Sequence, residues 1–193
     1  MTRSTWIAWA LLGVWSVWIF ALQGLCAARM GSSTWIPDVG LVVLLSLAAR
    51  LSHEDLPKAA LIVAVARCAV SIDAPVAVLA GYGGAIALAR ALRGVFEISG
   101  ALPRTLLAGA NAWLVAGWLA FAHELRDARV VAQLTGAAPD LGQLGLALTS
   151  AWPTALSSAL TALVLGPLLG QLPGLSPLAK KHRWHVVASY PWS

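Results

Sequence analysis

The stretch PKAALIVAVARCAVSIDAPVAVLAGYGGAIALARALR, residues 57–93, determines how the rest of the chain is interpreted. It consists of two apolar arms that meet at Ile72, Asp73, Ala74 and Pro75. We therefore predict helices over residues 57–72 and 75–92. Because so few residues connect them, these two helices must be antiparallel neighbours.

The composition indicates a membrane protein. Of the 193 residues, 59% are hydrophobic and only 11% are charged, whereas a soluble domain carries about 25% charged residues. So few charges could not cover a soluble surface, so the bilayer is the expected solvent. The net charge of +5 does not indicate a nucleic-acid partner, because the basic residues lie in short clusters between apolar runs. Such clusters are typical of loops that face an anionic membrane surface.

Six helices are predicted to form a single transmembrane domain, residues 1–175, followed by a basic cytoplasmic tail, residues 176–193. Besides the hairpin, the helices cover residues 6–27, 37–51, 103–122 and 144–172. The first run is longer than the ~7–15-residue apolar core of a signal peptide, so we expect it to be retained. The second helix is predicted to begin at Pro37 and Asp38, because a proline and a carboxylate both suit the first turn of a helix. This helix, with 15 residues, is short for a full span. Three alternatives remain: residues 34–36 extend it, it tilts in a locally thinned bilayer, or it ends partway through the membrane.

The distribution of basic residues predicts the orientation. With six spans, nine Lys and Arg side chains fall on the side of the termini and three on the other side. The positive-inside rule then places both termini in the cytoplasm of a multi-pass membrane protein. Residues 123–143 are predicted to be the longest polar loop. The last helix contains Pro153 and Pro167, so a kink or a broken end is expected there.

Small residues recur every four positions on three predicted helices. Since lipid is as apolar as leucine, membrane helices associate through close packing of such residues. One stripe is formed by Ala77, Gly81, Ala85 and Ala89. The other two comprise Ala108, Ala112, Ala116 and Ala120, and Ser158, Ala162, Gly166 and Gly170. We expect these stripes to be helix-packing surfaces.

No catalytic, cofactor-binding or metal-binding motif is present in the sequence. Both cysteines, Cys26 and Cys68, lie in apolar runs and are interpreted as buried packing residues. All four histidines lie outside the predicted spans, and His182 and His185 favour a solvated tail over a metal site, which needs three or four ligands. We therefore expect a protein that is not an enzyme and has no cofactor.

Three polar residues within or beside the predicted spans, Arg67, Asp73 and Asn111, are candidate intramembrane site residues, because an ionisable group in a span suggests a function. On one continuous helix, Arg67 and Asp73 would point roughly 120° apart, so we do not expect a simple helical ion pair. One interpretation turns Arg67 towards backbone carbonyls or lets it snorkel, while Asp73 caps the helix that follows. The other places both in a polar pocket between helices. Asn111 is expected to make an interhelical hydrogen bond.

The order of these features resembles the rod shape-determining protein MreD family. The resemblance rests on a long first helix, a second helix that opens as Pro37-Asp38 and continues in leucine and valine, and a hairpin that turns at Pro75. A small-residue final helix after Trp152-Pro153 completes it. It implies a non-enzymatic inner-membrane component of the bacterial elongation complex that binds the bitopic protein MreC. Through MreC it would act on MreB and on peptidoglycan synthases.

Two other functions remain open. The six-helix fold of that family is similar to the substrate-binding subunits of energy-coupling-factor transporters, so a vitamin-type small-molecule binder is the alternative. A membrane enzyme is the third, although the sequence offers no nucleophile, metal set or carboxylate pair at useful spacing.

Overall fold

The computed structural model describes residues 3–30, 35–48, 50–93, 100–135, 143–169 and 171–178, and these parts are helical with short connections. The helices are α1 (Arg3–Arg29), α2 (Val39–Ala48), α3 (Leu56–Val70), α4 (Pro75–Arg93), α5 (Ala101–Thr135), α6 (Gln143–Ser150), α7 (Trp152–Val164), α8 (Gly166–Leu169) and the 3-10 turn η1 (Ser176–Leu178). The all-α prediction is confirmed for these residues.

Three described helices are long and apolar enough to cross a membrane: Thr5–Arg29, Pro75–Leu92 and Ala101–Val130. Large apolar side chains remain exposed on the outside of the bundle, including Trp6 and Trp18 of α1 and Leu160 of α7. In water such a surface would be unfavourable, whereas lipid solvates it. The exposed surface therefore has the character of a membrane protein.

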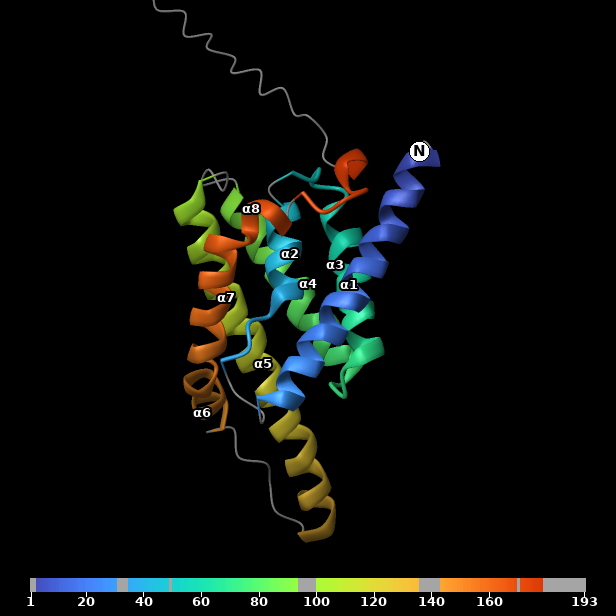
Figure 1. The fold of residues 1–193 in the computed structure, drawn as a ribbon. Coiled ribbons are helices and arrows are strands. Elements are labelled where there is room, and N and C mark those ends of the chain that lie inside the picture. The colour runs from blue at the N-terminus through green and yellow to red at the C-terminus, as the bar shows by residue number, and fades with distance from the viewer. Residues whose placement is uncertain are drawn as a thin grey trace, which may run out of the picture.

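Successive helices run in alternating directions (Figure 1). Helices α1, α3 and α5 run towards one end of the bundle, and α2, α4 and α7 run back. The residues that follow α8 return to the N-terminal half of α1, where Trp15 Nε1 donates to Pro173 O at 3.3 Å. The two ends of the described chain therefore lie at the same end of the bundle.

Helix α2 is the central element of the fold. Nine of its ten residues are buried, and it contacts α1, α3, α4, α5, α7 and α8. A helix that is apolar all round has no face for solvent, which explains its central place. It begins at Val39, two residues later than expected, and at 1.5 Å per residue it is about 15 Å long. Residues 35–38 are not helical, so they do not extend this helix; that it tilts in a thinned bilayer or ends partway through the membrane stays a prediction.

The prediction of a polar loop over residues 123–143 is wrong for its first part, because α5 continues to Thr135. No glycine or proline interrupts residues 118–135, and Glu124, Arg126 and Arg129 are good helix formers. His123 Nε2 and Asp127 Oδ2, 3.6 Å apart, add an i,i+4 pair on the exposed surface. This part of α5 projects beyond the neighbouring helices in Figure 1.

The last predicted helix is divided into α6, α7 and α8, so the expected interruption is confirmed. The breaks fall at Ala151 and Leu165, close to Pro153 and Pro167. Proline removes an intrahelical hydrogen bond and clashes with the preceding turn, and a broken helix relieves both.

The stripe on α4 is buried at all four positions, Ala77, Gly81, Ala85 and Ala89. A Cβ added at Gly81 would lie 3.2 Å from Trp118 of α5, so α4 and α5 approach closely there. Trp118 Nε1 also donates to the backbone oxygen of Ala77 at 2.9 Å.

The stripes on α5 and α7 are buried in part. Ala108 and Ala112 are buried, whereas Ala116 and Ala120 are half-buried. Ser158, Ala162 and Gly166 are buried, and Gly170 lies outside the described residues.

Two expectations about packing need correction. Cys26 is exposed, so its predicted burial is wrong, whereas Cys68 is half-buried and packs against the core. Both cysteines are free. The packed chain also continues past residue 175, since Leu178 is buried in the same core as Leu12 and Leu175. The rest of the predicted tail, residues 179–193 with His182 and His185, lies outside the described residues.

Candidate functional site

A buried network of charged and polar side chains joins α2, α3 and α4. Arg67, in the last turns of α3, donates from Nη1 to Asp38 Oδ2 and, at 3.1 Å, to Tyr82 Oη. Tyr82 of α4 donates in turn to the Asp38 carboxylate, at 2.9 Å from Oδ1 and 3.0 Å from Oδ2. Arg67 Nε donates to Asp73 Oδ2 at 3.3 Å. One guanidinium is therefore shared by two carboxylates and a phenol.

The position of Asp38 follows from the start of α2. It is the residue before the helix, and its Oδ1 accepts a hydrogen bond from the backbone N of Leu41 at 2.9 Å. This is the geometry of an N-cap, in which a carboxylate satisfies a free N–H and faces the positive end of the helix dipole. The backbone N of Asp38 donates to Ser158 Oγ of α7 at 2.9 Å. The predicted match between this carboxylate and the helix start is confirmed, although Pro37 lies before the helix rather than within it.

The same network involves α1 and α7. The guanidinium carbon of Arg67 lies 5.9 Å from the ring centroid of Phe20 in α1, within the range of a cation–π contact. Helix α7 is connected to the network because its Ser158 Oγ accepts a hydrogen bond from the backbone N of Asp38. Five helices therefore meet at one set of polar contacts.

Both interpretations of Arg67 and Asp73 need revision. Helix α3 ends at Val70 rather than at residue 72, so the two residues are not on one helix and the predicted 120° separation does not apply. They form an ion pair at 3.3 Å. Among the described residues, the hydrogen-bond partners of the Arg67 side chain are side chains rather than backbone carbonyls. The carboxylate of Asp73 binds Arg67 and no backbone amide of α4, so the predicted cap is wrong.

Two members of the network were not predicted from the sequence. Asp38 was expected at a helix start but not as an ion-pair partner of Arg67, and Tyr82 was not identified at all. A signal was available for Asp38. A buried arginine requires a carboxylate, and Asp38 and Asp73 are the acidic residues at the ends of apolar runs near it. No comparable signal identifies Tyr82, because a tyrosine in a small-residue helix is also a normal packing residue.

Asn111 lies apart from this network, and its predicted interhelical hydrogen bond is wrong. Its side chain is fully buried in α5, and Nδ2 donates to Leu107 O of the same helix at 2.8 Å. Its Oδ1 is buried and has no hydrogen-bond partner in the described structure. An asparagine in a helix interior often bonds back to the preceding turn in this way.

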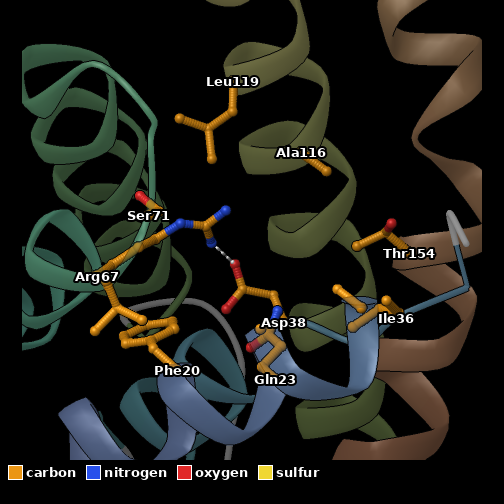
Figure 2. A pocket seen from close by; sticks show the side chains of 12 residues that line it. Phe20, Gln23, Ile36, Asp38, Arg67, Ser71, Ala116, Leu119 and Thr154 are labelled. Carbon is orange, nitrogen blue, oxygen red and sulfur yellow. Dashed lines mark hydrogen bonds and ion pairs between the residues drawn. The ribbon is translucent and has the colours of Figure 1, made fainter. Parts of the chain in front are cut away.

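A cavity of about 360 Å3 lies against the network. Its walls come from α1, the segment before α2, the end of α3, α5 and α7, with Phe20, Gln23, Arg67, Ser71 and Leu119 among the lining residues (Figure 2). Asp73 and Asn111 do not line it. The pocket hypothesis therefore holds for Arg67 alone among the three candidate residues.

The described side chains of this network interact through hydrogen bonds and charge. Among the residues that the structure describes, no group of three or more His, Cys, Asp or Glu could hold a metal ion. The carboxylate of Asp38 is occupied by Leu41, Arg67 and Tyr82. Such an arrangement fixes helices relative to one another, since breaking a buried pair leaves an uncompensated charge.

Comparisons with known protein families, with curated proteins and with solved structures give no match for this chain.

Proposed function

We propose that this protein is a non-enzymatic, multi-pass membrane subunit of the MreD type. In this role it binds an MreC-like bitopic protein and contributes to cell shape and lateral peptidoglycan synthesis. MreB and the peptidoglycan synthases are its indirect partners. The proposal includes six spans, an arrangement similar to energy-coupling-factor substrate-binding subunits, and both termini in the cytoplasm of a bacterial inner membrane.

The observation that carries the proposal is that the polar groups between the helices hydrogen-bond to one another. The Pro37-Asp38 start of the second helix and the hairpin that turns at Pro75 are the features on which the family resemblance rests. Asp38, Arg67 and Tyr82 join these two features through direct hydrogen bonds. Their hydrogen bonds hold helices together, which is what a rigid membrane adaptor requires.

The six-span arrangement is supported by the path of the chain. Helices alternate in direction, and the segment after α8 packs beside the start of α1. The charged end of α5 projects from the opposite end of the bundle (Figure 1). A chain with an even number of spans places its two ends on one side, and the nine-to-three bias of Lys and Arg assigns that side to the cytoplasm.

The test is capture from native membranes. The tagged protein is solubilised in mild detergent, and co-purified proteins are identified by mass spectrometry. We expect enrichment of a bitopic coiled-coil protein, encoded beside a gene for an actin-like protein. An unrelated multi-pass protein with the same tag is the control. Equal recovery of the bitopic protein with the control would contradict the proposal.

A second function is favoured by one observation, the cavity of about 360 Å3 beside Arg67. Ligand sites are typically ~300–1,000 Å3, mostly apolar, with a few polar groups. The alternative is therefore a vitamin-type binding subunit of an energy-coupling-factor transporter. A specific small molecule retained through purification, together with capture of a transporter module in place of the bitopic protein, would favour it.

A further inference from the structure

A second hollow, distinct from the one beside Arg67, is a groove between α3 and α4 with a volume of about 240 Å3. Apart from Arg90, its walls are apolar side chains and glycine. The groove opens on the outside of the bundle, since Leu61 of α3 is 55% exposed and Leu79 of α4 is 40% exposed. In a membrane this face of the hairpin lies against lipid.

The groove exists because small residues line it. Ala60 and Ala64 of α3 are buried, whereas Gly83 and Ala87 of α4 are exposed. A Cβ added at Gly83 would have no heavy atom within 4 Å. The described protein therefore leaves this space unfilled. An apolar groove gains dispersion contacts when a chain of matching shape lies in it.

The length of the groove selects a lipid chain rather than another helix. Its lining on α4 extends from Leu79 to Arg90, which is about 16 Å at 1.5 Å per residue. The hydrocarbon core of a bilayer is about 30 Å thick, so the groove covers about one leaflet. An acyl chain occupies one leaflet, whereas a transmembrane helix packed here would need a matching surface across both.

The groove is basic at one end. Pro57, in the first turn of α3, and Arg90, in the last turn of α4, lie at the same end of the antiparallel hairpin. Arg90 is exposed and forms no ion pair with a described residue. Lys58 lies beside Pro57 and already pairs with Asp55 at 3.1 Å. Arg90 is therefore the cation with charge left for a ligand.

The position of this charge selects the head group. The bias of Lys and Arg assigns this end of the hairpin to the cytoplasmic side. Basic pockets between transmembrane helices on that side bind anionic head groups. A zwitterionic head group would bring its own cation to Arg90 together with its phosphate, whereas an anionic head group brings only negative charge.

We infer that this groove binds an anionic phospholipid of the cytoplasmic leaflet. One acyl chain lies along the groove against Leu61, Leu79 and Ala87, and the phosphate accepts hydrogen bonds from the guanidinium of Arg90. The inference uses the proposed membrane orientation but not the proposed partner. Its test needs no partner protein, so its failure is distinguishable from a failure of the proposed function.

The test is a lipid titration of the full-length protein in detergent micelles, with native mass spectrometry to count the bound lipids. The probes are phosphatidylglycerol and phosphatidylcholine with the same palmitoyl and oleoyl chains. R90Q removes the charge at the groove. R126Q is its matched control, because Arg126 is an exposed arginine on the projecting part of α5. Each variant is first checked for the elution profile of the wild type.

The second pair of variants tests the groove itself. G83L fills it with a side chain, and leucine is a better helix former than glycine. G84L is the matched control, because Gly84 does not line the groove and a Cβ added there also has no heavy atom within 4 Å.

We expect the first phosphatidylglycerol to bind with a dissociation constant about fivefold lower than that of phosphatidylcholine, the effect of one basic residue near an anionic surface. R90Q should remove this preference and R126Q should keep it. G83L should weaken the binding of phosphatidylglycerol about fivefold or more, and G84L should leave it unchanged. Equal dissociation constants for the two lipids, equal losses in R90Q and R126Q, or equal effects of G83L and G84L would each overturn the inference.

A helix of a partner protein is the competing occupant. If G83L abolishes capture of the bitopic protein from native membranes while its phosphatidylglycerol binding is that of the wild type, the groove is a protein-docking surface and the inference is wrong.

Discussion

Replacing Arg67 by methionine should destabilise the protein by about 3 kcal/mol. Removing one partner of a buried ion pair costs about 3–5 kcal/mol, because the other charge stays buried and unpaired. The Arg67 side chain is 17% exposed and that of Asp38 is 8% exposed, and Asp38 keeps its bonds to Leu41 and Tyr82. These features reduce the penalty, so we expect the lower end of the range.

The assay is equilibrium unfolding by sodium dodecyl sulfate in mixed micelles, followed by tryptophan fluorescence. K58M is the matched control, because Lys58 pairs with Asp55 at 3.1 Å with its side chain 53% exposed, and such pairs contribute at most about 1 kcal/mol. The combined D38N/R67M variant should lose less stability than the sum of the single variants, by about 1.5 kcal/mol. If R67M costs no more than K58M, or if D38N and R67M are additive, the network does not hold the helices together.

Three further substitutions test the packing by the same unfolding titration. N111L should leave stability unchanged or raise it by about 1 kcal/mol, because it removes a buried, unpaired oxygen; a large loss would point to a partner for Asn111 outside the described structure. G40V should cost about 3 kcal/mol or prevent folding, because a Cβ at Gly40 would lie 2.1 Å from the ring of Phe20; a neutral result would refute that contact. W118F should cost about 1 kcal/mol by removing the bond from Trp118 to the backbone of Ala77, and no change would mean that this bond contributes nothing.

The helical fold could be predicted because apolar runs and prolines act locally. The hairpin around Pro75 and the breaks near Pro153 and Pro167 follow from residues a few positions away. The C-terminal end of α5 could not be predicted in the same way. Charged residues after position 122 suggested a loop, yet charged residues are compatible with a helix that projects beyond its neighbours.

The site was only partly predictable because its partners are distant in sequence. Arg67 and Asp38 are 29 positions apart, and Asp38 and Tyr82 are 44 apart. Residue type showed that Arg67 needed a partner, whereas only the packing of α2 between α3 and α4 selects Asp38. The cavity depends on side chains from five segments, so no local pattern indicates it.

The central claim, a role in cell elongation, is tested most directly by depleting the protein in its native host and measuring cell shape by microscopy. We expect cells to lose their cylindrical form and become rounded, and expression of the wild-type chain to restore rods. Expression of the K58M variant should restore them equally, which controls for a generic effect of substitution. Cells that keep normal rod dimensions after complete loss of the protein would contradict the proposed function.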